Sequence, residues 1–315
     1  MEKNKFFEFS LFSIMKKIFF TLAVVYCSMA IFAQSANDYS SVDEVMLRIP
    51  KSATFSTTDM ADYINHNFKK QADKARAIYF WITTNIQYDI RQKSVVYYND
   101  DYTELMENVL TKKKGICMHY ALLFNEIAQK TGIKSYVVFG YTKQDGKVDI
   151  VPHAWCAAQI DSSWFLFDPT WGAGYVQNST YIRKQNNDYF KMTSQESIKN
   201  RIPFDPLWQL CDYPITNKEF YQEKLPENKN RQYFNYQDSL SLYEHSSEWD
   251  RAISSVRRIE KNGVVNSLIS HRLETLTKKI KYYRDEKTMN CLNAAVNFYN
   301  SGIEQLNKFI DYRNE

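Results

Sequence analysis

The segment from residue 115 to residue 168 constrains the fold most, because its pattern changes from helical to strand periodicity at a glycine. Apolar residues recur at helical spacing over residues 116–130, and Gly132 lies where a helix often ends. Three runs rich in β-forming residues follow, and a two-residue turn, Asp161-Ser162, separates the last two; the runs are residues 134–142, 153–160 and 163–168. A helix followed by an antiparallel sheet predicts an α+β fold.

Three residues in this segment have the chemistry of a cysteine nucleophile. Cys117 begins the predicted helix, His153 lies on one predicted strand, and Asp168 ends the next. Backbone N–H groups and the positive end of the helix dipole stabilise a thiolate at a helix start, and the same N–H groups can hold an oxyanion. The three residues therefore predict a catalytic triad in which Cys117 is the nucleophile.

The predicted hairpin indicates how the last two residues meet. If Ile160 pairs with Ser163 across the turn, Asp168 lies opposite Trp155 and diagonal to His153. Alternation along a strand places His153 and Trp155 on one face and Cys156 on the other. Asp168 can then orient the imidazole of His153.

Two alternative interpretations compete with the triad. Each residue taken singly is compatible with a structural role: a buried cysteine, a satisfied core histidine and a helix-capping aspartate. Cys117, His119, His153 and Cys156 together are also zinc-ligand types. Residues two apart on a helix point about 200° apart, and residues three apart on a strand face opposite sides, so the zinc geometry is unfavourable. We expect no metal and no cofactor.

The N-terminus predicts export. Lys16-Lys17 precede an apolar run that closes on small residues at Ala33, which indicates a signal peptide over residues 1–33 and a periplasmic or secreted protein. The run is shorter than the roughly 20 residues that cross a membrane, so no stable membrane insertion is expected after cleavage. Cleavage leaves a net charge of +2, which gives no indication of nucleic-acid binding. Whether translation begins at Met1 or Met15 stays open.

The remaining chain divides by character. Residues 36–226 contain the α+β segment, preceded by an amphipathic helix predicted over residues 73–87 and a polar surface loop over residues 88–101. Residues 230–315 predict an all-helical C-terminal subdomain, with stripes such as Leu268, Leu273, Leu276 and Ile280 and then Leu292, Ala295 and Phe298. We expect packing or partner contact from this region.

Several motifs in fixed order resemble the transglutaminase-like superfamily, in the branch of kyphoscoliosis peptidase and the cytokinesis-type transglutaminase-like proteins. The resemblance covers roughly residues 40–225. It is carried by the runs Trp81-Ile82-Thr83-Thr84-Asn85-Ile86-Gln87-Tyr88-Asp89, Lys114-Gly115-Ile116-Cys117, Pro152-His153-Ala154-Trp155, Asp168-Pro169-Thr170-Trp171-Gly172-Ala173-Gly174, Asp188-Tyr189-Phe190, Phe204-Asp205-Pro206-Leu207-Trp208-Gln209-Leu210 and Pro214-Ile215-Thr216.

The resemblance implies a papain-like fold in which the helix bearing Cys117 packs on an antiparallel sheet. It implies a cysteine protease, amidase or transglutaminase that acts on peptide bonds or glutamine carboxamides through a thioester, with His153 as base and Asp168 as orienting group. Its partner would be a protein or peptide substrate, a cell-wall peptide among the candidates. Hydrolysis and crosslinking both stay open.

The chain differs from the family pattern at two places. Met118-His119 follow the cysteine where the family usually has an acidic or amide residue and then glycine, and Cys156 stands where it usually has asparagine. Members of this superfamily include proteins without activity. A non-catalytic binding or scaffold module is therefore the alternative function.

Overall fold

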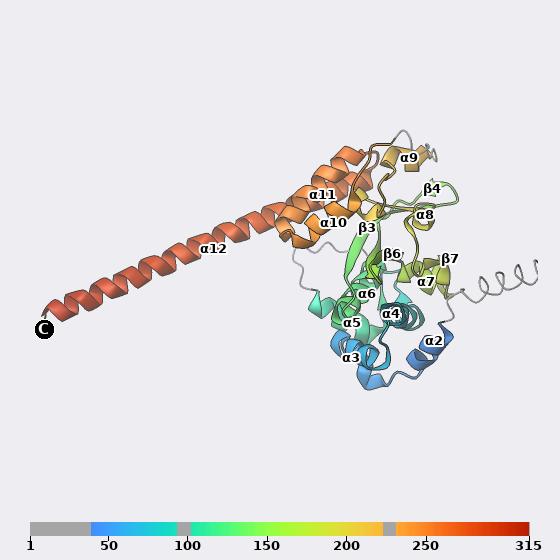
Figure 1. The fold of residues 1–315 in the computed structure, drawn as a ribbon, viewed down its shortest axis with the longest axis horizontal. Coiled ribbons are helices and arrows are strands. Elements are labelled where there is room, and N and C mark those ends of the chain that lie inside the picture. The colour runs from blue at the N-terminus through green and yellow to red at the C-terminus, as the bar shows by residue number, and fades with distance from the viewer. Residues whose placement is uncertain (1–38, 93–101, 223–230, 315) are drawn as a thin grey trace, which may run out of the picture. The chain divides into compact units, whose positions relative to one another are not determined.

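The computed structural model describes residues 39–92, 102–222 and 231–314 (Figure 1). Two compact units divide the chain, residues 1–48 and 49–315. The first contributes one described helix, α2 (Ser40–Leu47). The predicted signal peptide, residues 1–33, lies outside the described residues. Within the described ranges, no helix is long and apolar enough to cross a membrane.

The second unit begins with helices. In chain order its elements up to the central helix are η1 (Lys51–Thr54), α3 (Thr57–Asn67), α4 (Gln71–Asn85), β1 (Gln87–Tyr88), α5 (Thr103–Lys112), β2 (Lys114–Gly115) and α6 (Cys117–Lys130). The remaining elements are β3 (Ser135–Gln144), β4 (Lys147–Val148), β5 (His153–Ile160), β6 (Ser163–Phe167), α7 (Pro169–Ala173), β7 (Gly174–Gln177), β8 (Thr180–Arg183), η2 (Asn187–Tyr189), α8 (Ser194–Ser197), β9 (Arg201–Pro203), η3 (Pro206–Gln209), α9 (Asn217–Gln222), α10 (Tyr236–His245), α11 (Glu248–Asn262) and α12 (Ser267–Asn314).

The central sheet has the antiparallel topology that the α+β prediction requires. Strands pair in the order β4-β3-β5-β6, and β9 pairs with β3 beside β4. The hairpin register is confirmed, because Ile160 pairs with Ser163 and Cys156 pairs with Phe167. The ladder ends there, so Asp168 is the first residue after β6 and not a paired strand residue.

Helix α6 lies against β5 and β3 on one face of the sheet. Its start and end follow from local conformation: Ile116 is extended, with φ −101° and ψ 176°, and Gly132 takes φ +84° just beyond the helix. The rings of Phe124 and Phe167 stack 5.0 Å apart between helix and strand. This packing places Cys117, at the start of α6, beside the end of the hairpin.

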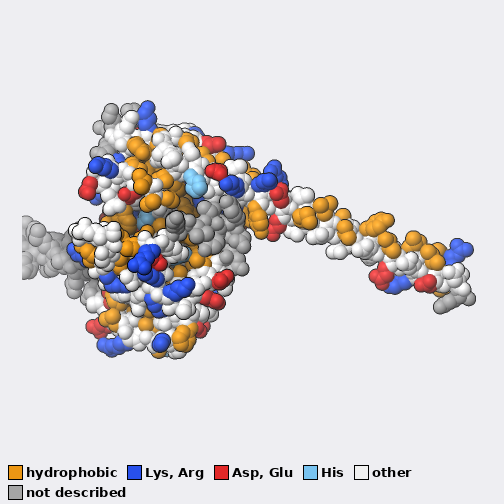
Figure 2. All heavy atoms as spheres, turned by 180° about the vertical axis from the view of Figure 1, so that it is seen from behind, with side chains coloured by type: hydrophobic (Ala, Val, Ile, Leu, Met, Phe, Trp, Pro, Cys, Tyr) orange, Lys and Arg blue, Asp and Glu red, His pale blue; other side chains and the backbone are white. Residues whose placement is uncertain are grey.

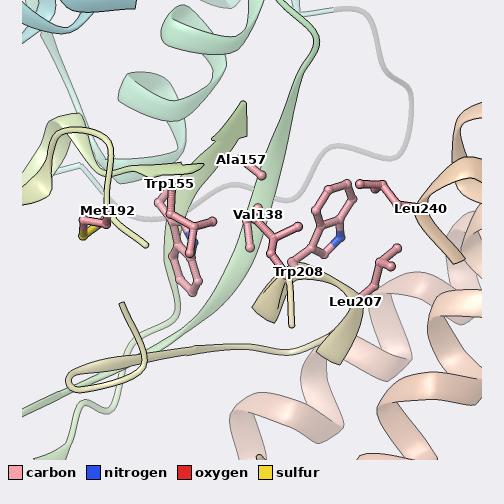
Figure 3. Close-up of a cluster of buried hydrophobic side chains, with 9 residues drawn as sticks. Val138, Trp155, Ala157, Met192, Leu207, Trp208 and Leu240 are labelled. Atoms are coloured by element: carbon pink, nitrogen blue, oxygen red, sulfur yellow. The ribbon is translucent and has the colours of Figure 1, made fainter. Parts of the chain in front are cut away.

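The other face of the sheet carries a second hydrophobic core (Figure 3). Trp155 and Val138 project from the central strands and pack with Trp208 and Leu207 of η3 and with Leu240 of α10. An adjacent core joins Tyr141 and Phe204 to the C-terminal helices; its helical members are Ala252, Ile259, Ile269 and Leu276. The C-terminal helices therefore share a core with the sheet.

Two predictions need correction. The helix predicted over residues 73–87 is α4, but residues 75–83 are all buried, so it is enclosed on every side and not amphipathic. Helices α3, α6 and α7 surround it. Tyr88, expected in a surface loop, belongs to β1 and pairs with Gly115 next to Cys117. The rest of that expected loop, residues 93–101, lies outside the described residues.

Candidate active site

Cys117 is the first residue of α6 and is 9% exposed. Its own N–H group and that of Met118 belong to the first helical turn, whose donors have no intrahelical acceptor. The side chain lines a cavity that His153 also lines, and the interaction with Cys117 contributes to the raised pKa of His153. The thiol therefore lies at the N-terminal end of a helix, beside the imidazole, where a substrate can enter.

His153 is the first residue of β5, and its imidazole connects the thiol to the carboxylate. Its Nε2 lies 2.7 Å from Oδ2 of Asp168, in a buried position. Because Nε2 is engaged by Asp168, Nδ1 is the ring nitrogen left for the thiol of Cys117. The two nitrogens therefore have the separate contacts that a general base needs.

Asp168 is the N-cap of α7 and uses its two oxygens differently. Oδ1 accepts hydrogen bonds from the N–H groups of Thr170 at 3.1 Å and Trp171 at 3.0 Å. Oδ2 accepts from His153 and from Nη1 of Arg201. The capping role and the orienting role are thus compatible in one side chain, because the cap holds the carboxylate in a fixed direction.

Arg201 is a site residue that the sequence interpretation missed. It lies on β9, is fully buried, and pairs with Asp168. The guanidinium carbon also lies 4.5 Å from the ring centroid of Trp171 and 5.0 Å from that of Tyr189. The one signal in the sequence is an arginine at the head of an apolar run, Ile202-Pro203-Phe204, where a buried cation needs a partner.

The charges of this group are coupled. Burial disfavours the imidazolium of His153, yet the carboxylate of Asp168 and the contact with Cys117 raise its pKa to about 9. Burial likewise opposes ionisation of Asp168, but His153 and Arg201 lower its pKa to about 2. The site therefore keeps Asp168 ionised at neutral pH, and the carboxylate stabilises the imidazolium that forms when His153 accepts a proton.

Two residues that depart from the family pattern, His119 and Cys156, have hydrogen-bond partners other than the thiol, whereas Met118 lines the cavity beside it. His119, at the third position of α6, accepts the N–H of Ile116 through Nδ1 at 3.0 Å and is buried. Burial lowers the pKa of His119, which keeps the ring neutral and able to accept. A Cβ on Gly115 would come within 2.8 Å of this ring, so glycine provides the room for it. His119 therefore caps the N-terminus of α6, the helix that carries Cys117.

Cys156 is buried on the α6 side of β5 and donates to the carbonyl of Ala121 at 3.1 Å. Burial raises the pKa of this thiol well above its usual range. The zinc-ligand set considered from the sequence is therefore divided, since His119 and Cys156 are engaged elsewhere. The described residues contain no group of three potential ligands that could hold a metal.

The two tryptophans near the site differ. Trp155 is fully buried in the core on the face of the sheet opposite α6. Trp171 is partly exposed, and its ring centroid lies 5.6 Å from that of His153. Trp171 therefore covers the imidazole and the Arg201 guanidinium together, which limits water around the charged groups.

A cavity of about 730 Å³ adjoins the thiol, within the size range of ligand pockets. Cys117, Met118 and His153 line one side of it. Residues of α11 and α12, among them Arg251 and Arg272, line another. The C-terminal helices, for which the sequence predicted only packing or partner contact, thus form a wall of the cavity.

Parts of the chain are similar to known proteins. Residues 58–169 match the family model of the transglutaminase-like superfamily. The chain is 27% identical over 219 residues to the Lim and transglutaminase domain protein ltd-1 of Caenorhabditis elegans, covering 64% of this chain and 29% of that protein. It is 30% identical over 159 residues to human kyphoscoliosis peptidase (Homo sapiens), covering 47% and 23%. The chain thus spans less than a third of the length of these relatives.

Among solved structures, the periplasmic domain of TgpA from Pseudomonas aeruginosa is similar with a TM-score of 0.31 and 19% identity. The similarity covers 42% of this chain and 48% of that one.

Proposed function

We propose that the chain is an exported cysteine enzyme of the transglutaminase-like superfamily, whose family model matches residues 58–169, and that it acts on amide bonds. Cys117 is the nucleophile, His153 the general base and acid, and Asp168 the orienting carboxylate. The reaction is acyl transfer from a peptide bond or a glutamine carboxamide, through a thioester on Cys117.

One observation carries this proposal: the continuous chain of contacts from Cys117 through His153 to Asp168. Cys117 and His153 line the same cavity and interact electrostatically, and Nε2 of the imidazole lies 2.7 Å from the carboxylate. A cysteine with a purely structural role does not require a neighbouring histidine that is itself paired with a buried carboxylate, as Cys117 has in His153 and Asp168.

The contacts support the following sequence of steps. The proton of Cys117 Sγ passes to Nδ1 of His153, and the thiolate attacks the carbonyl carbon of the amide. The oxyanion forms near the N–H groups at the start of α6. His153 then returns the proton to the nitrogen of the leaving group, which departs as an amine or as ammonia. Water or an amine attacks the thioester while His153 accepts its proton; the C–S bond then breaks, the acyl product leaves, and His153 returns the proton to Sγ of Cys117.

The buried ion pairs support the first step. Asp168 stays ionised across the physiological range, because its pKa is lowered to about 2. The raised pKa of His153 means that a proton taken from Cys117 is held as imidazolium at neutral pH. Arg201 keeps Asp168 ionised without donating to the reacting groups, since it contacts the carboxylate and not the thiol.

The substrate and the compartment belong to the same proposal. The predicted signal peptide supports a periplasmic or secreted location. The cavity beside Cys117 has room for several residues of an extended peptide. A protein or cell-wall peptide is the substrate class that this location makes available.

The rate of iodoacetamide alkylation at Cys117 against pH, read by peptide mass spectrometry, tests the nucleophile. We expect fast alkylation of Cys117 at and below neutral pH, and a rate in His153→Ala that falls to that of an ordinary thiol. Cys291, which is exposed, serves as the reference thiol in the same sample. If Cys117 matched Cys291 in both proteins, the enzyme proposal would fail and a binding or scaffold module would replace it.

A further inference from the structure

The C-terminal half of α12 has no cover within the described chain. Ile269 and Leu276, in the first half, are buried against the core shared with α11. Every residue from Arg284 to Asn314 is exposed. Figure 2 shows hydrophobic side chains along this part of the helix, where it extends beyond the body of the unit. An exposed apolar surface of this kind usually marks a contact with another molecule.

The exposed apolar residues follow a regular repeat. They alternate at spacings of three and four along one stripe, and each is 42% to 72% exposed; they are Met289, Leu292, Val296, Tyr299, Ile303, Leu306 and Ile310. This is the heptad pattern of a coiled coil, with Met289, Val296, Ile303 and Ile310 at the a positions and Leu292, Tyr299 and Leu306 at the d positions. Its mean period of 3.5 residues matches a left-handed supercoil.

The residues that flank the stripe carry no charge. The e positions hold Asn293, Asn300 and Asn307, and the g positions hold Ala295, Gly302 and Phe309. The charged residues Glu304 and Lys308 occupy outer positions and pair with each other at 2.7 Å. Two identical helices can therefore pack along this stripe without placing like charges opposite each other. A different helix could not be selected by opposite charge, because the e and g positions carry no charge to pair with it.

We propose that residues 289–310 of α12 form a parallel two-stranded coiled coil with the same segment of a second copy of this chain. The choice of residues in the stripe supports both the strand number and the direction. Three of the four a positions are β-branched, Val296, Ile303 and Ile310, and two of the three d positions are leucine; this combination favours two parallel strands. The 22 residues span about 33 Å of helix.

The oligomeric state tests this proposal directly. Sedimentation equilibrium of the purified protein should give twice the monomer mass. Ile303→Asp, which places a charge in the seam of both strands, should raise the dissociation constant more than ~100-fold. Ser301→Asp is the matched control, because it adds the same charge at an outer f position and should leave the dimer intact. A cooperative urea unfolding transition shows that each variant is folded.

A disulfide experiment tests the direction of the strands. In a Cys291→Ser background, Leu292→Cys should crosslink to its counterpart under mild oxidation, since d positions face each other in a parallel pair. Ala294→Cys, at an outer position, should not crosslink. An antiparallel pair would place position 292 opposite position 310, and no crosslink would form at 292.

Three results would overturn the proposal. These are a monomeric wild-type protein at tens of micromolar, a dimer that survives Ile303→Asp, and an assembly of three or more chains. The last is a real alternative, because Phe298 and Tyr312 lie at outer c positions and stay 80% and 77% exposed in a two-stranded arrangement.

Discussion

The candidate active site and the C-terminal half of α12 both differ from the usual arrangement, in which charged side chains are exposed and apolar ones are buried. At the candidate site, the side chains of His153, Asp168 and Arg201 are buried. Along residues 284–314, large apolar side chains are exposed. Buried charges are tolerated because they are paired with one another, and exposed apolar groups are tolerated when a partner covers them. The first departure is compensated inside the chain, and the second needs another molecule.

The largest expected effect is a difference in activity between variants of the two buried cysteines, Cys117 and Cys156. Cys117→Ala should abolish acyl transfer, because no other thiol contacts His153 in the described structure, and the free energy of unfolding should change little. Cys156→Ala should keep the activity and lose about 1–2 kcal/mol of stability, since its thiol only packs and donates to Ala121. Ammonia release from a glutamine peptide, peptide-bond cleavage in casein and urea denaturation measure these effects. Equal loss of activity in both variants would remove the distinction.

Asp168→Asn should lower the rate by about 10⁴-fold while the secondary structure is retained. An amide can donate to Nε2 of His153, which selects the tautomer in which Nδ1 carries the proton and cannot accept one from Cys117. Asp205→Asn is the control, because Asp205 is a buried N-cap that pairs with Arg258 instead of His153. A near wild-type rate in Asp168→Asn would show that the carboxylate does not orient the base.

Arg201→Met should destabilise the protein by about 3–5 kcal/mol, because it leaves the buried carboxylate with one ionic partner fewer. The pKa of Asp168 should rise from about 2 towards its ordinary value. The stability that this carboxylate contributes is present above that ordinary value and is lost as pH falls through the folded pKa. The pH at which stability and reaction rate fall on the acid side should therefore be higher in Arg201→Met than in the wild-type protein. Urea midpoints and rates from pH 2 to 6 measure both shifts.

Arg258→Met is the matched control for that variant. It removes a similar pair, in which Arg258 donates to both oxygens of Asp205 at 2.7 Å, without touching Asp168. It should lower the free energy of unfolding and leave unchanged the pH at which the reaction rate falls on the acid side. If both variants shifted that pH equally, Arg201 would have a structural role alone.

A smaller effect should appear at alkaline pH. The pKa of His153 is raised from 6.5 to about 9, so the imidazolium contributes stability that is complete below pH 6.5 and is lost as pH rises to about 9. Urea midpoints measured from pH 6 to 9.5 should therefore fall in the wild-type protein. His153→Gln should show a flatter profile over the same range. Parallel profiles would mean that His153 is not held as imidazolium.

The smallest effect is expected at α12. A chain that ends after Thr288 should match the monomeric Ile303→Asp variant in its free energy of unfolding to within about 0.5 kcal/mol, because the residues it lacks are exposed in a single chain. Its rate of acyl transfer should equal that of the full chain. A large loss of activity or stability would show that the C-terminal half of the helix supports the body of the protein, and the comparison between the two regions would no longer hold.

Much of the site could be predicted from sequence because its parts are local in the chain. The helix start at Cys117, the strand from His153 to Ile160 and the two-residue turn all follow from short patterns. The turn alone determines the hairpin register, and the register brings His153 near Asp168. Arg201 could not be placed in this way, since it reaches Asp168 from a strand 33 residues later that pairs with β3.

The fold class and the order of the candidate site residues, Cys117, His153 and Asp168, were determined by the sequence alone, because periodicity and turn chemistry act over a few residues. The amphipathic assignment of α4 failed, since helices far apart in sequence enclose it. Tertiary structure alone decided which charges meet, that His119 caps α6, and that α11 and α12 form a wall of the cavity. Burial and ion pairing depend on groups brought together from distant parts of the chain, and no local pattern contains that information.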